Sequence, residues 1–349
     1  MKSSLYYDKN DSKWLLLDEV IKVFDSRRTH QELAKNGIKP INRARDILKI
    51  VMVALFYDLE ISYVVSELNR NKKLQKQLKI DVIYTADQIY EFFSRFSHEQ
   101  ILEFVIKMLN NLNFKNTRGI RHIIVDGTDI QIDLSWFRRK ISKKSLKKKP
   151  YKWGYSSSKG YYIGFKLTLA IDCRTMQPVA MLLHEGTPND AKIFDEIMNE
   201  LKIRRIIRRG DNLFFDKGYF SKDNFQLAIT KYETAVLIFP RGKNPVQSVS
   251  DHISFPLEVF TDRGKDKEFY KALTKKVLER LENWENYKGL RNKIEDFNKL
   301  LKVGLSLTKI HRYTKESTHK FVWLNVFLGG IITSNDFRTK KEIQRLTEM

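Results

Sequence analysis

Two aspartates in this sequence follow short apolar stretches and come one or two residues before a glycine. Asp126 follows residues 123–125, and Asp216 follows residues 213–215. Runs of β-branched and aromatic residues of this length are typical of buried strands, so each carboxylate is predicted to lie at the end of a core strand. Such carboxylates are candidate ligands for a divalent cation, because hard cations such as Mg²⁺ prefer oxygen ligands.

A third acid, Glu295, lies in a stretch that is typical of an amphipathic helix. Apolar residues recur there at spacings of four, three and four from Leu290 to Leu301. At about 100° per residue, four polar residues fall within an arc of about 80° on a different face. These four are Tyr287, Arg291, Glu295 and Lys302. One helix is therefore predicted to present an acid beside two cations and an aromatic hydroxyl.

Three acids of this kind suit phosphoryl transfer. Two Mg²⁺ ions held by carboxylates can activate water or a 3′-hydroxyl and stabilise the leaving oxygen at a phosphodiester. Neighbouring Arg and Lys side chains would then bind the flanking phosphates. A single Asp in a loop is more often a cap or a turn residue, so the prediction rests on the combination.

Three short motifs carry these acids. They are Val125-Asp126-Gly127-Thr128, Phe215-Asp216-Lys217-Gly218-Tyr219 and Arg291-x3-Glu295-x6-Lys302, in that order. Together they resemble the Asp-Asp-Glu transposases of prokaryotic insertion sequences, in particular the cut-and-paste group with a Tyr-Arg-Glu-Lys signature. Gly186-Thr187-x-Asn189-Asp190 is similar to a segment between the two aspartates of these enzymes. The resemblance covers roughly residues 120–335. Tyr287 and Arg291 are separated by three residues where the signature has two.

The resemblance implies an α/β protein with a ribonuclease-H-like mixed sheet flanked by helices. In it, Asp126, Asp216 and Glu295 would be both the catalytic residues and the metal ligands, for two Mg²⁺ ions or for Mn²⁺. Tyr287, Arg291 and Lys302 would contact DNA. The implied reaction is nicking at the inverted repeats that end a mobile element, exposure of a 3′-hydroxyl and its joining to double-stranded target DNA. Since two ends must be held together, a homodimer in the DNA complex is also implied.

Two other functions fit the same residues. A metal-dependent DNA endonuclease on this core would cleave DNA without joining it. A DNA-binding protein descended from such an enzyme would have lost catalysis, although the presence of all three acids argues against that reading.

Charge also points to a polyanionic partner. The chain has 64 Lys and Arg against 42 Asp and Glu, a formal net charge of +22, and such a field attracts nucleic acid. A lysine-rich or ribosome-associated protein is the alternative. Residues 138–152 hold nine Lys or Arg and no acid, which predicts DNA contact rather than a solvated hairpin loop. The candidate contacts are Arg138, Arg139, Lys140, Lys147, Lys148, Lys149 and Lys152.

Changes in composition divide the chain into domains. Residues 1–115 are helical in pattern and are predicted to help bind the element's ends. Residues 116–335 alternate strands and helices, as in an α/β sheet, with a predicted insertion at 242–283. Residues 336–349 are expected to be a C-terminal tail.

Other residues have weaker assignments. Asp190 is interpreted as a cap of the helix that follows it. Asp129 and Asp133 follow Asp126 as alternative ligands, although Asp129 would point to the opposite face of an extended strand. Trp284 is either a base-holding aromatic, by resemblance, or a core anchor.

The chain is expected to work in the cytoplasm, in association with the nucleoid and without a membrane partner. A single cysteine, Cys173, excludes an internal disulfide framework and a cysteine-based zinc site. Residues 1–10 do not have the pattern of a signal peptide. The longest apolar runs fall short of the roughly 20 residues of a membrane span.

Overall fold

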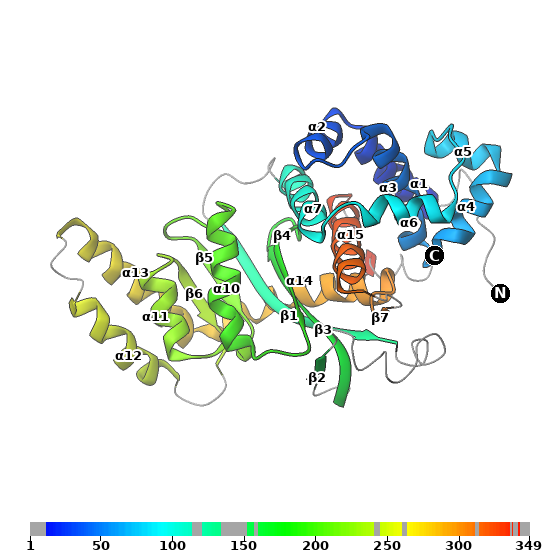
Figure 1. Ribbon diagram of the computed structural model, residues 1–349. Helices are drawn as coiled ribbons and strands as arrows, with labels where there is room; N and C mark the ends of the chain where they lie inside the picture. Colours follow the sequence, from blue (N-terminus) through cyan, green and yellow to red (C-terminus); the bar gives the residue numbers. More distant parts are fainter. Residues whose placement is uncertain are drawn as a thin grey trace. The chain divides into compact units, whose positions relative to one another are not determined.

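The computed structural model describes residues 12–113, 121–133, 152–156, 160–240, 245–259, 264–310, 314–335, 337 and 341–342 (Figure 1). The chain forms two compact units. The helical unit comprises residues 1–114 and 299–349, and the sheet unit comprises residues 115–298. The sequence-based division assigns residues 116–335 to the sheet domain, and this division into domains stays a prediction.

The helical unit begins with seven consecutive helices. They are α1 (Ser12–Asp25), α2 (Arg27–Lys35), α3 (Ile41–Phe56), α4 (Ile61–Arg70), α5 (Lys72–Leu78), α6 (Ala86–Ser94) and α7 (His98–Asn113). Helix α6 starts at a capping box, in which the Thr85 and Gln88 side chains each accept a hydrogen bond from the other residue's backbone N–H. Ser97 and Gln100 make the same pair of bonds before α7.

The C-terminal part of the helical unit supplies its core. A π-helical turn η4 (Leu300–Gly304) and a two-residue strand β7 (Lys309–Ile310) precede α15 (Lys315–Ser334). Almost every residue of α15 from Thr318 to Thr333 is buried. The ring of Phe327 lies 5.8 Å from the rings of both Phe24 and Phe104. A helix that is apolar around its whole circumference must be enclosed by other helices, and α15 is enclosed in this way.

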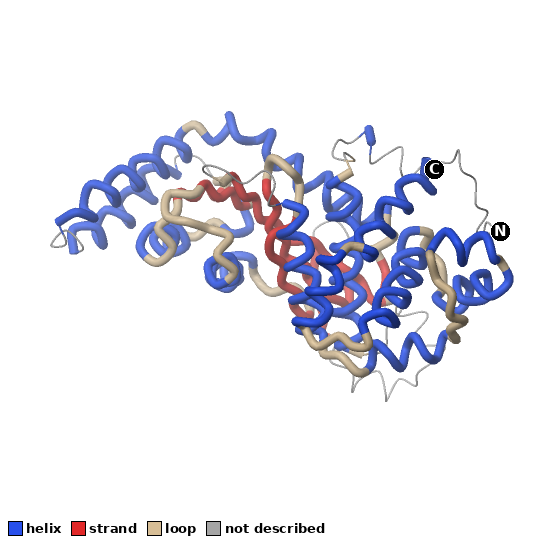
Figure 2. Tube along the Cα trace, turned by 90° about the horizontal axis from the view of Figure 1, so that it is seen from above, coloured by secondary structure: helices blue, strands red, loops and turns tan. Residues whose placement is uncertain are grey.

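The sheet unit alternates strands and helices. Its first half holds β1 (His122–Ile132), β2 (Lys152–Ser156), β3 (Gly160–Asp172), β4 (Pro178–Glu185) and α10 (Asp190–Ile203). Next come β5 (Asn212–Phe215), the 3₁₀ turn η2 (Lys217–Tyr219), α11 (Lys222–Thr230) and β6 (Ala235–Ile238). The last elements are α12 (Pro245–Val259), α13 (Gly264–Glu282), the 3₁₀ turn η3 (Trp284–Tyr287) and α14 (Lys288–Lys299). Helices α12 and α13 fall within the predicted insertion and pack on each other (Figure 2).

The order of the strands confirms the predicted fold class. β3 pairs antiparallel with β1 on one side and with β4 and β2 on the other. β5 pairs parallel with β1, and β6 pairs parallel with β5. An antiparallel meander of three strands followed by two parallel strands, with helices packed on the sheet, is the ribonuclease-H-like arrangement. In the parallel pair of β1 and β5, Val125 is aligned with Phe215, the residues that precede Asp126 and Asp216.

Each face of the sheet has its own covering helix. Side chains of successive strand residues point to opposite faces. Phe215 packs on Phe194 of α10, with ring centroids 4.8 Å apart, whereas Phe214 packs on Tyr287, just before α14, at 5.7 Å. By the same alternation, Asp126 lies on the α14 face and Gly127 on the α10 face.

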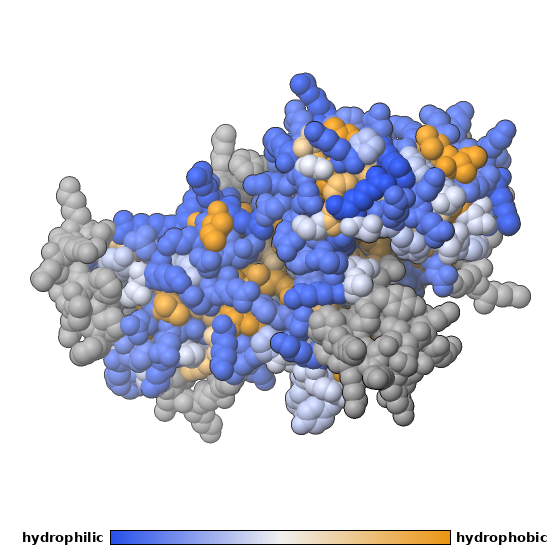
Figure 3. Space-filling view, in the orientation of Figure 1, coloured by the Kyte–Doolittle hydropathy of each residue, from blue (hydrophilic) through white to orange (hydrophobic). Residues whose placement is uncertain are grey.

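The surface in view is mostly hydrophilic, with small separate apolar patches (Figure 3). Exposed apolar side chains that are scattered singly are normal for a folded protein. No helix within the described ranges is both long and apolar enough to cross a bilayer.

Candidate active site

Asp126 carries a crowded carboxyl on the α14 face of β1. The prediction that it ends a core strand is wrong, because β1 continues past it to Ile132, whereas Asp216 directly follows β5 as predicted. Its Oδ1 accepts a hydrogen bond from the backbone N–H of Gly127 at 2.8 Å, and its Oδ2 accepts one from Asn298 Nδ2 at 3.4 Å. Burial disfavours the charged form and the neighbouring charge of Asp216 repels it, so the pKa of Asp126 is raised to about 7. The Gly127 N–H and the charge of Arg291 oppose this rise, and Asp190 adds to it.

Asp216 is brought beside Asp126 by strand pairing. Val125 and Phe215 are partners in the parallel pair of β1 and β5, so the residue after each one emerges at the same edge. Asp216 then begins the turn η2, where its carbonyl accepts a hydrogen bond from the Tyr219 N–H at 3.0 Å. Its Oδ1 is buried and meets no described donor in hydrogen-bonding geometry. Two carboxylates from two core strands therefore face each other.

Arg291 connects Asp216 with Glu295. Its Nη1 lies 3.3 Å from Asp216 Oδ1, and its Nε lies 2.9 Å from Glu295 Oε1. Arg291 and Glu295 are one turn apart on α14, as their spacing predicts. Both side chains are roughly half exposed. The guanidinium of Arg291 thus lies between the carboxylate of Asp216, after β5, and that of Glu295, on α14.

This donor set fits divalent cations of the Mg²⁺ class. The donors are carboxylate oxygens, which are the ligands that such ions prefer. Burial contributes most to the raised pKa of Asp126, and the charge of Asp216 adds to it against the opposing charge of Arg291. Ions bound there would be held by Asp126, Asp216 and Glu295.

A fourth acid, Asp190, lies behind this site on the α10 face. The interpretation of Asp190 as a helix cap is wrong, because the cap of α10 is Asn189, whose side chain accepts from the Ala191 N–H. Asp190 Oδ1 instead lies 2.6 Å from the ammonium of Lys166, a buried residue of β3. The same ammonium donates to the carbonyl of Pro188 at 3.2 Å.

Two glycines make room for this ion pair. A Cβ at Gly218 would lie 2.6 Å from Asp190 Oδ2, and one at Gly127 would lie 2.6 Å from Lys166 Cε. Gly127 directly follows Asp126 inside β1 and Gly218 lies two residues after Asp216, so the pair packs directly behind both predicted catalytic aspartates. This role of Asp190 and Lys166 was not predicted from the sequence. The two glycines were the signal, since a glycine beside a strand end often marks a close approach.

The other predicted helix-face residues lie outside regular α-helix. Tyr287 belongs to the 3₁₀ turn before α14, and Lys302 belongs to the π-helical turn after it. A wheel of 100° per residue does not describe these turns, whose periods differ from that of the α-helix. Tyr287 packs on Phe214, and Lys302 falls in the helical unit. Of the four residues, Arg291 and Glu295 are in direct contact.

The predicted DNA-contact residues are described only in part. Lys152 is exposed at the start of β2, 3.9 Å from Glu185 Oε2. The other six, Arg138, Arg139, Lys140, Lys147, Lys148 and Lys149, lie outside the described residues, as does most of the basic segment.

The alternative ligands and Trp284 have other surroundings. Asp129 is the register partner of Lys166 on the α10 face, as expected from alternation along β1. Asp133 lies just beyond the end of β1. Trp284 is half-buried, with the Lys288 ammonium 4.4 Å from its ring centroid and the Phe239 ring at 6.2 Å.

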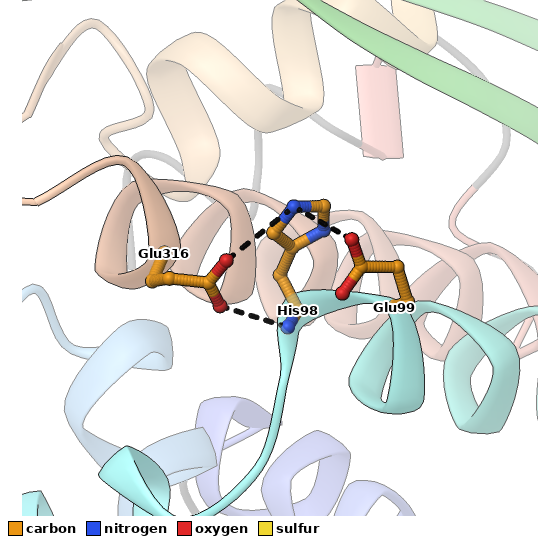
Figure 4. A group of neighbouring side chains, drawn as sticks. All are labelled: His98, Glu99 and Glu316. Atoms are coloured by element: carbon orange, nitrogen blue, oxygen red, sulfur yellow. Dashed lines mark hydrogen bonds and ion pairs between the residues drawn. The ribbon is translucent and has the colours of Figure 1, made fainter. Parts of the chain in front are cut away.

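A separate cluster of possible ligands occurs in the helical unit. The ligand atoms of His98, Glu99 and Glu316 lie within 4.8 Å of one another (Figure 4). Glu316 Oε2 already accepts from the His98 backbone N–H at 2.9 Å, and the Lys320 ammonium is 3.7 Å from that oxygen. These contacts join the first turns of α7 and α15, which explains the cluster without a metal ion.

One protein family and two solved structures are similar to this chain. The family described as the transposase DDE domain matches residues 117–328. No curated protein is similar enough to count as a match. The piggyBac transposase in a synaptic complex with hairpin DNA has 11% identity and a TM-score of 0.42, over 97% of this chain and 80% of that one. The Mos1 strand transfer complex has 13% identity and a TM-score of 0.21, over 80% of each chain. These two likenesses are too distant to add to the family match.

The pKa of Asp126 predicts how metal affinity depends on pH. Below about pH 7 a proton occupies the carboxylate that a cation needs, so the apparent Kd for Mn²⁺ should rise up to about tenfold per pH unit. Above that pH the affinity should level off. Calorimetric titration between about pH 6 and 8 measures this, and D126N should remove the dependence. An affinity that stays constant across this range in the unmodified protein would contradict the assignment.

The same shift predicts the stability of the metal-free protein. The folded state keeps the Asp126 proton to a higher pH than the unfolded chain, so the free energy of unfolding should fall between about pH 4 and 7. D126N should remove this loss and be more stable than the unmodified protein at about pH 8, by roughly 1–2 kcal/mol for a partly buried carboxyl. Thermal unfolding in EDTA tests the difference.

G218A should disturb the site from behind. The new methyl group would collide with Asp190, and overpacking of this kind costs about 1–3 kcal/mol. We also expect the Mn²⁺ affinity to fall about tenfold, because loss of a residue that orients a metal ligand typically lowers metal affinity 10–100-fold. G289A is the matched control, since nothing lies within 4 Å of a Cβ there. Equal Mn²⁺ affinities for G218A and G289A would show that the ion pair does not support the site.

Proposed function

Because the chain belongs to the family of transposases that share the DDE domain, we propose that it nicks DNA at the ends of an insertion sequence and joins the exposed 3′-hydroxyls to target DNA. Its substrates would be double-stranded: the terminal inverted repeats of the element and the target. Work on such substrates would take place in the cytoplasm, at the nucleoid.

One observation carries the proposal. Arg291 contacts both Asp216 and Glu295, and its charge lowers the pKa of Asp126. The acids come from β1, the end of β5 and α14, which are far apart in the sequence. No requirement of folding brings acids from three elements around one cation, because their mutual repulsion opposes it.

Divalent cations complete the proposed chemistry. Two bound Mg²⁺ or Mn²⁺ ions would act as Lewis acids on the phosphodiester and lower the pKa of the attacking water or 3′-hydroxyl. Asp126, Asp216 and Glu295 would hold them. Asn298 keeps Asp126 oriented through its hydrogen bond to Oδ2. The Lys166–Asp190 ion pair, which lies behind Gly127 and Gly218, would help to hold Asp126 and Asp216 in position.

Arg291 would change partners during this reaction. In the absence of metal its guanidinium balances Asp216 and Glu295. When those carboxylates face metal ions, the half-exposed guanidinium is released to bind a phosphate of the DNA strand beside the cleaved bond. Arg suits this role because its planar donor group matches both carboxylate and phosphate.

The net charge and the requirement for two ends define the partners. A charge of +22 favours a DNA polyanion over a neutral or acidic partner. The basic residues 138–152 and the helical unit are the proposed sources of additional DNA contacts. Two copies of the chain would hold two element ends together in the active complex.

An incubation with DNA carrying the element's ends, with Mg²⁺ or EDTA, tests the function. We expect nicked and joined products that require Mg²⁺. D216N and E295Q should each lower the yield of both products more than about a hundredfold. Loss of a residue that only orients a metal ligand already lowers metal affinity or activity 10–100-fold. Their affinity for the same DNA should remain. E282Q, which alters an exposed acid of α13, is the control and should stay active.

Each other outcome identifies a different protein. Cleavage without joining would make it an endonuclease. A mobility shift without any product from the unmodified chain would make it an inactive DNA binder. Products formed equally well in EDTA would exclude the metal-dependent mechanism.

A further inference from the structure

A cationic pocket lies at the start of α14, away from the acids. It encloses about 590 Å³ and opens between the C-terminal end of α13 and the turn η3. Its walls are Lys276, Glu279, Arg280, Asn283, Asn286 and Tyr287. None of the residues that line this Lys276–Arg280 pocket is one of the three acids Asp126, Asp216 and Glu295.

Arg280 is a buried cation without a carboxylate partner among the described residues. Its side chain is 9% exposed. The guanidinium carbon lies 5.9 Å from the Phe214 ring centroid and 6.0 Å from that of Tyr287, and Nη1 donates to the Ala235 carbonyl at 3.4 Å. A buried charge without an opposite charge is costly. The aromatic rings, a hydrogen bond with the Tyr287 side chain and one carbonyl stabilise the guanidinium without supplying a full opposite charge, which leaves a preference for an anion.

The surroundings of Arg280 are positive as well. Burial and the charge of Arg280 lower the pKa of Lys276. The pKa of His122 is lowered mainly by burial, and also by the positive charges of Arg280, Arg174 and Lys276. A positive potential therefore extends over the first residues of β1.

The nearby acids cancel this potential only in part. Glu279, the one acid in the pocket wall, is exposed and lies 3.8 Å from the ammonium of Lys275. Asp211 raises the pKa of Lys276, but its two carboxylate oxygens already accept from the backbone N–H groups of Arg121 and Arg208.

The pocket is joined to the acids by one helix. Lys288, Asn292 and Glu295 are exposed at spacings of four and three, so they form one stripe along α14. Glu295 is eight positions after Tyr287, which is about 12 Å at 1.5 Å per residue. A DNA strand carries one phosphate per 3.4 Å of helix axis, so a duplex whose axis runs along α14 places about three to four phosphates over this distance.

We propose that the Lys276–Arg280 pocket binds a backbone phosphate of the DNA strand three to four nucleotides from the bond that is cleaved. This assignment rests on the proposed function, because it takes the acids as the cleavage site. The phosphate would lie between the Lys276 ammonium and the Arg280 guanidinium, with Asn283 and Asn286 at the rim. Its role would be to set the register of the strand on α14.

Binding to an end-containing duplex in EDTA at several salt concentrations tests the pocket. Loss of one phosphate contact should reduce the slope of log K against log[salt] by about 0.9. K276Q should show this change and bind roughly five- to tenfold more weakly at about 0.1 M salt. R280Q should behave in the same way. K271Q is the control, because it removes the same charge from an exposed position of the same helix and should leave slope and affinity unchanged.

The position of the phosphate needs a second measurement. Single phosphates of the strand are replaced in turn by neutral methylphosphonates. In the unmodified protein, replacement at three or four nucleotides from the cleaved bond should weaken binding about fivefold to tenfold, and the same replacement should have no effect in K276Q. Lys276 is only half-buried, so K276Q keeps the test decisive if R280Q does not fold.

The outcomes separate this inference from the function. Equal slopes for K276Q and K271Q, or a methylphosphonate pattern that is the same in both proteins, would overturn the pocket assignment even with normal cleavage. Failure of cleavage with a reduced slope for K276Q would overturn the function and leave a phosphate site. If inorganic phosphate at millimolar concentration protects the protein from unfolding while DNA binding is the same in K276Q, the pocket takes free phosphate and not the DNA strand.

Discussion

Mutual repulsion of acids is the constraint around which the sheet unit is arranged. Parallel pairing of β1 with β5 aligns Val125 with Phe215, and this alignment forces Asp126 and Asp216 to the same edge of the same face. Burial of Asp126, together with the charge of Asp216 beside it, raises the pKa of this carboxyl to about 7. Apolar or paired residues at these positions would be more stable. Each pKa unit of this shift means that the folded protein disfavours the charged form of Asp126 by about 1.4 kcal/mol relative to the neutral form. Arg291 offsets part of the repulsion by contacting Asp216 and Glu295, and divalent cations would offset the rest.

The opposite face of the sheet contributes as much to this site as the face that carries the acids. Along a strand, the residue after an inward-facing acid points to the other side. After Asp126 that residue is Gly127, and its missing side chain lets Lys166 approach β1. Gly218 does the same for Asp190 after β5. An ion pair at 2.6 Å therefore fills the space behind Asp126 and Asp216, and a larger residue at either glycine would collide with it.

The sequence allowed the fold class and the local placement of the acids to be predicted, because both follow from short patterns. Residues 123–125 and 213–215 lie in strands, although β1 runs past Asp126 to Ile132 instead of ending there. The spacing of Arg291 and Glu295 puts them in contact on α14. The role of Asp190 was not predictable in this way. It depends on Lys166, which is distant in the chain, and on a cap function that Asn189 performs instead. The common face of Tyr287, Arg291, Glu295 and Lys302 assumed one uninterrupted α-helix. The chain uses a 3₁₀ turn at one end and a π-helical turn at the other, and neither is visible in apolar periodicity.

Helix α14 separates the cationic pocket from the acids, and this separation has a mechanical consequence. Lys276 and Arg280 of α13 lie beside the turn that precedes α14, and the later turns of α14 carry Glu295 and Asn298 beside Asp126. Cations and acids placed on separate flexible loops would collapse onto each other. Along α14 the distance between them is set by the rise of 1.5 Å per residue. A polyanion held in the pocket would thereby be kept at a set distance from the acids without neutralising them. Metal ions and a DNA strand would then be bound at the same time instead of competing for the same charges.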